Sequence, residues 1–498
     1  TAKGACRAEA LVCSLSYRSR YYDRCHSHWA CFHPGFSILN IEIGKSLKLT
    51  HLTPAMRDTL TEQLTMINPK WLENERMGRW NRGTPKTLRL YSKWKDSLWI
   101  PRGYMRRLLM LCRENHVEAH IEDRRRALPE TDLTFSGSLK RFQAAAVKKM
   151  LTKEFGTLSA PTGSGNTFMG LYLIARRRQP AIDIVHTKDL AHQCVELIQQ
   201  LMGIPEKEVG FIGGGRHKVG SRITVALVQS LYKCGSQLAP QIGHLVVDEC
   251  HRTPSRTFTD AVKAFDAQYM LGLSATPWRR DRLSKLIFWH LGNVHHEIAS
   301  AGLVESGDVL AADVVIRETD FRPYFDPVSE YSRMLSELTE DKERNLLIVK
   351  DVAATLRESR GVCLVLSDRK AHCENLRVLL KYRHQITAEV LTGDVSSKDR
   401  KTLTARLQAG DIKVLIATGQ LIGEGFDCPQ LETLFLVTPI RFSGRLLQYL
   451  GRILRPAPGK RGARVFDYVD IHVDTLVKAA NARQRVYPQP ARTGKAVP

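Results

Sequence analysis

The stretch APTGSGNTFMG, residues 160–170, decides how the rest of this chain is interpreted. It follows the apolar segment GTLSA and precedes the helix-like segment FMGLYLIARRR, so it joins a strand to a helix. Its glycines let backbone amides approach a phosphate closely, and the N-terminus of the following helix adds a favourable dipole. We therefore predict a nucleotide-binding loop formed by Pro161, Thr162, Gly163, Ser164, Gly165, Asn166 and Thr167. Taken alone, the stretch is also compatible with an ordinary strand-to-helix turn.

Two adjacent positions of this loop differ in what they can offer a nucleotide. The hydroxyl of Thr167 is a suitable ligand for Mg²⁺. Asn166 stands where loops of this type carry a lysine, and an amide cannot supply the cationic contact to the β- and γ-phosphates. We therefore expect weak or absent ATP hydrolysis in this chain unless another cation replaces the lysine.

A second signal is the segment HLVVDECHRTP, where an apolar strand ends in Asp248, Glu249 and, two residues later, His251. A carboxylate at a strand tip can hold Mg²⁺ through water, and its neighbour can orient and deprotonate an attacking water. We assign the first role to Asp248 and the second to Glu249. A solvated acidic strand end is the alternative, and it is disfavoured because the glycine-rich loop precedes it.

Short apolar runs alternate with helix-length segments on both sides of these motifs, which is typical of βαβ units around parallel sheets. AIDIVHT, RITVALVQ, HLVVDE and YMLGLSAT predict one sheet, and GVCLVLS, AEVLTG, KVLIAT, ETLFLVT and ARVFDYV predict a second. We predict an accessory region over 1–130, α/β domains over 131–305 and 336–480, a linker over 306–335 and a flexible basic tail over 481–498.

The composition favours a nucleic-acid partner. The formal net charge is +23, an excess typical of polyanion-binding proteins. The 11 scattered cysteines fit reduced thiols, so we expect an intracellular, cytoplasmic protein, associated with the nucleoid if it is bacterial. No apolar run is long enough for a membrane helix, and no membrane partner is expected.

The accessory region interleaves cations with aromatic rings, as nucleic-acid grooves do. These residues are Lys70, Trp71, Arg76, Arg79, Trp80, Arg82, Lys86, Arg89, Tyr91, Lys93, Trp94, Lys95, Trp99, Arg102, Tyr104, Arg106 and Arg107. Each ring could equally belong to a core. Cysteines and histidines between Cys6 and His33 invite a zinc interpretation, but they include no CxxC pair, so a structural zinc site is the less favoured alternative.

Several segments, in this order, resemble the motifs of the superfamily 2 helicases and translocases of DEAD/DEAH type. They are LKRFQAAAV, the glycine-rich loop, IVHTKDLAHQ, VALVQSL, VVDECH, LGLSATPWR, LVLSDRKAHCENL, LTGDVSSKDRKTLTARLQAGDIKVLIATGQLIGEGFDCPQLETLFLV and LLQYLGRILRP. TKDL, GLSATPWR, DKERN and GEGFD look more like the branch of XPB and the type I/III restriction translocases, whose members act mainly on duplex DNA.

The resemblance implies two tandem RecA-like parallel-sheet domains after an N-terminal accessory domain. It also implies that Arg141 and Gln143 lie near adenine, and that Gly425, Asp427, Arg452 and Arg455 serve the nucleotide from the second domain. The spacing of Gln448, Arg452 and Arg455 by four and three predicts one shared helix face. The alternative is a basic surface helix.

We therefore expect an ATP-dependent helicase or translocase that uses Mg²⁺ and acts on nucleic acid, with duplex DNA favoured and RNA as the alternative substrate. The catalytic residues would be Asp248, Glu249, His251, Gln448, Arg452 and Arg455. The competing hypothesis is a nucleic-acid-binding scaffold subunit of a defence or repair complex that does not hydrolyse ATP. Asn166 favours that alternative, and other protein partners stay open.

Overall fold

The structure is a computed structural model that describes residues 38–250, 256–275, 283–358, 361–419, 428–440, 443–460, 462–487 and 492–493. The chain divides into two compact units, residues 1–160 with 165–298, and residues 161–164 with 299–498. In the described residues, no helix is both long and apolar enough to cross a membrane.

The first unit is built on an eight-stranded sheet in the order β11-β10-β12-β9-β13-β14-β8-β15. Its pairs are parallel except β10–β11. The strands are β8 Phe155–Ser159, β9 Ala181–Val185, β10 Gly210–Gly213, β11 Arg216–Lys218, β12 Ile223–Leu227, β13 His244–Val247, β14 Tyr269–Ser274 and β15 Val294–Glu297. Every residue of β9, β12 and β13 is buried, as expected for parallel strands covered by helices on both faces.

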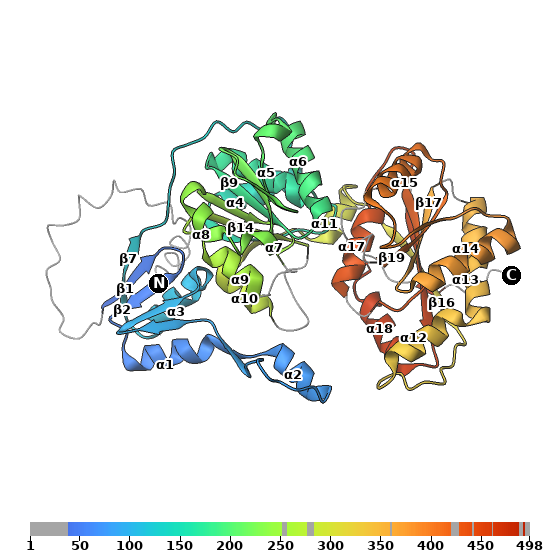
Figure 1. The fold of residues 1–498 in the computed structure, drawn as a ribbon, viewed down its shortest axis with the longest axis horizontal. Coiled ribbons are helices and arrows are strands. Elements are labelled where there is room, and N and C mark those ends of the chain that lie inside the picture. The colour runs from blue at the N-terminus through green and yellow to red at the C-terminus, as the bar shows by residue number, and fades with distance from the viewer. Residues whose placement is uncertain are drawn as a thin grey trace, which may run out of the picture. The chain divides into compact units, whose positions relative to one another are not determined.

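The helices of this α/β layer follow the strands in the alternation that the sequence predicts (Figure 1). They are α4 Arg141–Leu151, α5 Asn166–Arg177, α6 Lys188–Met202, α7 Val228–Leu231, α8 Gly235–Leu238, α9 Arg256–Lys263 and α10 Ser284–Leu291, with 3₁₀ turns η3 Glu206–Glu208 and η4 Ala239–Gln241. Since β8 and β13 are parallel and separated only by β14, the loops that follow them leave the same edge of the sheet.

A second, five-stranded sheet in the order β5-β6-β2-β1-β7 precedes this layer in the chain. Its strands are β1 Ile38–Ile43, β2 Leu47–Thr50, β5 Ser92–Trp94, β6 Ser97–Ile100 and β7 Glu118–Asp123. A separate two-stranded ribbon is formed by β3 Thr65–Ile67 and β4 Thr87–Arg89. The helices of this region are α1 Pro54–Gln63, α2 Pro69–Arg76, η2 Arg102–Tyr104 and α3 Met105–Glu114.

Two arginines, of which Arg102 is buried and Arg126 is partly exposed, attach the five-stranded sheet to the parallel sheet. Arg102 is 1% exposed and donates to the carbonyls of Gly44, at 3.3 Å, and Ala267, at 2.8 Å. Arg126 pairs with Asp266 through two hydrogen bonds of 2.9 and 3.1 Å. These hydrogen bonds join segments next to the two sheets, which belong to one compact unit.

The second unit contains a seven-stranded parallel sheet in the order β18-β19-β17-β20-β21-β16-β22. The strands are β16 Ala312–Thr319, β17 Val362–Ser367, β18 Glu389–Leu391, β19 Val414–Thr418, β20 Leu431–Leu436, β21 Ala463–Asp470 and β22 Arg492–Thr493. The helices are α11 Ser300–Glu305, α12 Tyr331–Glu340, α13 Lys342–Glu358, α14 Lys370–His384, α15 Ser397–Ala409, α17 Ser443–Ile453 and α18 Asp474–Gln484. The predicted α/β class with two parallel sheets and an N-terminal accessory region is confirmed.

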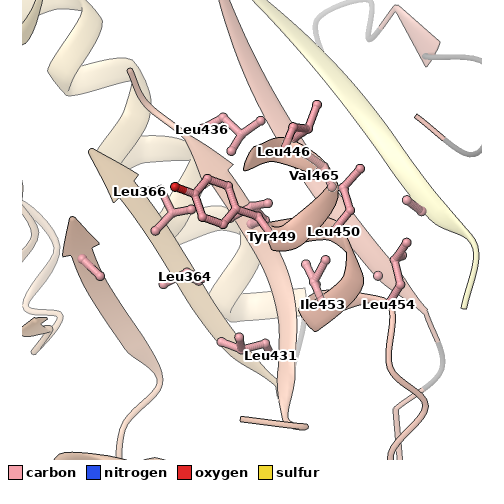
Figure 2. Packing of buried hydrophobic residues seen from close by; sticks show 14 of the residues in the cluster. Leu364, Leu366, Leu431, Leu436, Leu446, Tyr449, Leu450, Ile453, Leu454 and Val465 are labelled. Atoms are coloured by element: carbon pink, nitrogen blue, oxygen red, sulfur yellow. The ribbon is translucent and has the colours of Figure 1, made fainter. Parts of the chain in front are cut away.

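Helix α17 supplies one side of the core of this unit. Leu446, Tyr449, Leu450 and Ile453 are each at most 2% exposed and face the sheet of β17, β20 and β21 (Figure 2). Their spacing of three and four residues places them on one face of the helix. This packing fixes the orientation of α17 and therefore the directions in which its polar residues point.

Two sequence boundaries need correction. The predicted linker 306–335 contains β16, which pairs with β21 over its full length and therefore belongs to the second sheet. Asp313, Arg317 and Glu318 interrupt its apolar pattern, which hid the strand. The predicted tail 481–498 begins inside α18, where Arg483 is 3% exposed and pairs with buried Asp467. These buried polar contacts explain why a basic composition misled the prediction.

Candidate functional site

The glycine-rich loop between β8 and α5 forms a tight turn. Gly163 and Gly165 have φ angles of +89° and +88°, a region that glycine adopts without a steric penalty. The Ser164 hydroxyl and its backbone N–H both donate to the Pro161 carbonyl, at 2.6 and 3.1 Å. Gly165 caps α5, so the first unpaired N–H groups of that helix lie at the end of the loop, where an anion binds favourably.

Asn166, the first residue of α5, turns its side chain back onto this loop. Its Nδ2 donates to the Ala160 carbonyl at 3.1 Å. Its Oδ1 is buried and has no hydrogen-bond partner among the residues that the structure describes. The position where a lysine would stand thus holds a neutral amide with an unused acceptor oxygen, which offers no attraction to a phosphate.

Thr167 and Asp248 meet at the edge where the loops after β8 and β13 emerge. Thr167 Oγ1 donates to Asp248 Oδ2 at 2.9 Å, and the Glu249 N–H donates to Asp248 Oδ1 at 2.8 Å. Burial, followed by the charges of Glu249 and Asp183, raises the pKa of Asp248 to about 8. A cation beside this carboxylate would offset those effects and favour its ionised form.

This pair fits Mg²⁺ better than it fits a metal held entirely by the protein. Mg²⁺ commonly takes one or two protein oxygens and completes its shell with water and phosphate. Thr167 and Asp248 supply two such oxygens. Within the described ranges, no group of three or more His, Cys, Asp and Glu side chains could hold a metal by itself.

Glu249 follows Asp248 with an unusual backbone. Its φ is +49°, in the left-handed region that side chains other than glycine rarely adopt. Such conformations concentrate at functional sites, where the surrounding structure maintains them. His251, predicted to act beside these carboxylates, lies outside the described residues.

Gln143 reaches the same loop from α4. It is 7% exposed, and its Oε1 accepts from the Lys140 N–H at 2.9 Å. A Cβ added to Gly165 would lie 2.7 Å from Gln143 Nε2, so the amide lies directly against the loop. Arg141, at the start of α4, is exposed.

Two features near the loop were missed in the sequence. Asp183, in the middle of β9, is 2% exposed, accepts from the Cys194 thiol at 2.9 Å and acts electrostatically on Asp248. The feature of the sequence that could have indicated Asp183 is an aspartate within the otherwise apolar run AIDIV. Phe135 packs edge-on against Phe168 of α5, with ring centroids 5.0 Å apart, and thus borders the helix that begins at the loop. It precedes Gln143 in an irregular segment with no local pattern.

In the second unit, α17 carries Gln448, which is 6% exposed, and the half-buried Arg452. Arg455 was predicted on the same helix face, but α17 ends at Ile453, so this prediction is wrong. Pro456 explains the difference, because the residue before a proline is disfavoured in helical conformation. Lys460 Nζ donates to the carbonyls of Ile453 and Arg455 after the helix ends. Gly425 and Asp427 lie outside the described residues.

Comparisons with known proteins agree with this arrangement. A family model described as the res subunit of type III restriction enzymes matches residues 136–279, and one described as the helicase conserved C-terminal domain matches residues 344–457. A protein of Acanthamoeba polyphaga mimivirus, provisionally named as an ATP-dependent RNA helicase, is 24% identical over 372 residues, 72% of this chain and 69% of the relative. A Sulfurisphaera tokodaii DNA 3'-5' translocase named as an XPB protein is 24% identical over 381 residues, 70% of this chain and 85% of the relative.

Among solved structures, a fragment from Vibrio vulnificus, provisionally assigned as the HsdR subunit of a type I restriction enzyme, has a TM-score of 0.54 at 18% identity. The match covers 72% of this chain and 69% of that one, and it supports the fold. With both helicase models matched in order, the chain belongs to the superfamily 2 helicases and translocases, which are nucleic-acid-dependent ATP hydrolases. Within that class it lies near the XPB proteins and the type I and type III restriction translocases.

Proposed function

We propose that this chain is a motor of the duplex-DNA-translocating kind whose ATP hydrolysis is weakened or abolished by Asn166. The observation that carries the proposal is the contact of Thr167 with Asp248, next to Glu249 and at the end of a loop with two left-handed glycines. That set can hold a nucleotide with Mg²⁺ and place a base beside it, which is what phosphoryl transfer to water requires.

The roles follow from position and chemistry. The N–H groups at the start of α5 hold phosphate oxygens, and Thr167 and Asp248 hold Mg²⁺, which would neutralise phosphate charge. Glu249 accepts the proton of the attacking water. Gln143 contacts the adenine, with Arg141 and the ring of Phe135 nearby, and Arg452 and Arg455 stabilise charge on the γ-phosphate. Gln448, His251, Gly425 and Asp427 are assigned to the same reaction through the family motifs.

Duplex DNA is the proposed substrate because the XPB-named relative is called a DNA translocase, while the mimivirus relative is named for RNA. The net charge of +23 supports binding through phosphates. We also propose an intracellular location, on the strength of this substrate. A scaffold subunit that binds nucleic acid without turnover is the second candidate, supported by the bond from the Asn166 amide to Ala160.

The experiment is steady-state phosphate release by the full chain without nucleic acid and with duplex DNA, single-stranded DNA or RNA, together with binding of each over a salt series. The motor proposal predicts affinity that falls steeply with salt, weak sequence dependence, and any turnover highest with duplex DNA. Stimulation of turnover by RNA alone would show that RNA, and not duplex DNA, is the substrate. Nucleic-acid binding with no nucleotide binding at all would favour the scaffold.

A further inference from the structure

Residues 65–89, here called the N-terminal arm, leave the core of the accessory region and return to it. The arm comprises β3, α2 and β4 and extends beyond α1 (Figure 1). Leu64 and Leu90, which flank it, are 0% and 8% exposed and are joined by the hydrogen bond from the Leu90 N–H to the Leu64 carbonyl. No residue of α2 is buried, so the arm is not held by an apolar core of its own.

Asparagine side chains fix the shape of the arm instead. Asn68 Nδ2 donates to the Pro85 carbonyl at 2.9 Å, and Asn68 Oδ1 accepts from the Lys70 N–H at 3.1 Å. Asn74 Nδ2 donates to Asn81 Oδ1 at 3.0 Å, and Asn81 Nδ2 donates to the Trp71 carbonyl at 3.2 Å. Because three of these bonds join α2 and its N-cap Asn68 to the return segment, the residues between them are held in place before any ligand binds.

The residue so presented is Trp80, whose side chain is 85% exposed. Trp71, in the same arm, is covered by Lys86, whose Nζ lies 5.1 Å from the ring centroid. Trp80 has no such cation and no aromatic neighbour among the described residues. A large exposed ring on an ordered support is typical of a binding surface, because leaving it in water has a free-energy cost that packing would avoid.

The arm that carries Trp80 is rich in cations. Its only acidic residues are Glu73 and Glu75. Against them it has six exposed Lys and Arg residues, which are Lys70, Arg76, Arg79, Arg82, Lys86 and Arg89. Within the part of the chain that the structure describes, none of the six forms an ion pair. Cations without acidic partners beside a free ring match a phosphate backbone that carries an accessible base.

We propose that the N-terminal arm recognises the end of a duplex or the junction of paired and unpaired strands, with Trp80 stacked on the exposed base and Arg79 and Arg82 on the adjoining phosphates. In continuous duplex each base face is covered by the next base pair, so only the phosphates are within reach. The arm therefore adds affinity for ends and forks over internal sites. This inference rests on the proposed function, since it specifies the nucleic-acid structure that the motor engages.

The test uses the full chain and a labelled forked duplex, displaced by unlabelled fork or by covalently closed circular duplex at equal base-pair concentration. Trp80→Ala is expected to weaken fork binding by about tenfold and to leave circle binding within about twofold, with Trp80→Phe close to the parent. The matched control is Trp94→Ala, which removes a ring that is 68% exposed on the five-stranded sheet, and it should keep the preference for the fork. The double variant with Arg79→Ala and Arg82→Ala should bind both DNAs more weakly, and its affinity should depend less on salt.

Equal fork affinity for Trp80→Ala and the parent, or an equal loss on fork and circle, overturns the arm proposal and leaves the motor proposal intact. A parent that binds neither DNA at low salt overturns the proposed function and the arm proposal with it. Since Trp80 is exposed, its variants should fold like the parent, which circular dichroism checks.

Discussion

The Thr167 hydroxyl donates to Asp248 Oδ2 across 2.9 Å, although the two residues follow β8 and β13, which are separated in the sheet by β14. The bond links the first turn of α5, where phosphate would bind, to the buried carboxylate at the end of β13. Because burial and neighbouring carboxylates raise the pKa of Asp248 to about 8, a cation is the natural partner for its ionised form.

Replacing Asp248 by Asn should remove the contribution of Mg²⁺ to nucleotide binding, since an amide keeps the hydrogen bond from Thr167 but carries no charge. In the Asn166→Lys chain, Mg²⁺ is expected to tighten binding of a fluorescent ATP analogue, and Asp248→Asn should abolish that increment. Asp132→Asn, at an exposed acid, is the control and should keep it. If Mg²⁺ tightened nucleotide binding equally with and without Asp248→Asn, the metal would not be bound by Asp248.

Glu249→Gln should separate binding from hydrolysis. The amide keeps the shape of the side chain but cannot accept the proton of water, so turnover in the Asn166→Lys chain should fall by about a hundredfold or more. ATP binding should stay within about twofold. Single-turnover phosphate release with saturating duplex DNA measures the first quantity, and analogue titration the second. Unchanged turnover would show that another group activates water.

Tyr449→Phe should weaken the second unit. The Tyr449 hydroxyl donates to the Gly419 carbonyl at 2.7 Å, and the ring is 2% exposed in the core shown in Figure 2. Losing the hydroxyl leaves a buried carbonyl without its donor, which costs about 1 to 3 kcal/mol of unfolding free energy. Urea unfolding measures the change, and Tyr382→Phe, at a ring that is 78% exposed, should cost little. Equal stability of both variants would refute this role.

His372 predicts how stability depends on pH. Its ring is 2% exposed, Nε2 donates to Asn345 Oδ1 at 2.8 Å, and burial lowers its pKa to about 3. As the pH falls below about 6.5, His372 is protonated in the unfolded chain but stays neutral in the folded chain. Its contribution to the free energy of unfolding is therefore complete above pH 6.5 and is lost as the pH falls toward 3, by about 1.4 kcal/mol per pH unit. Urea unfolding at pH 7 and pH 5 should show that the free energy of unfolding decreases less for His372→Gln than for the parent. Parallel losses would exclude the buried histidine as the cause.

The fold and most of the nucleotide loop could be predicted because their signals are local. Strand β13 and the residues Asp248 and Glu249 form one short segment, and Gly163 and Gly165 have the backbone that only glycine favours. Asp183 could not be placed beside Asp248, because only the pairing of β9 with β13 brings the two strands together.

Other errors had physical causes that composition does not show. Arg455 was placed on α17 because spacing alone ignores the effect of Pro456 on the residue before it. Strand β16 was hidden by its charged residues, although one of them, Arg317, pairs with buried Asp351. In the arm, Trp80 and Trp71 look equivalent in sequence, and only the contact with Lys86 distinguishes the covered ring from the free one.

The proposal that Asn166 suppresses ATP hydrolysis is tested by steady-state phosphate release from the parent and from Asn166→Lys, each with saturating duplex DNA and without it. Thr167, Asp248 and Glu249 are joined by hydrogen bonds in the arrangement that the proposed reaction requires, so we expect that restoring one cation is sufficient. We expect a slow parent and an Asn166→Lys chain that is about a hundredfold faster and stimulated by DNA. A fast parent would show that the lysine is not needed, and an Asn166→Lys chain as inert as a slow parent would contradict the motor proposal.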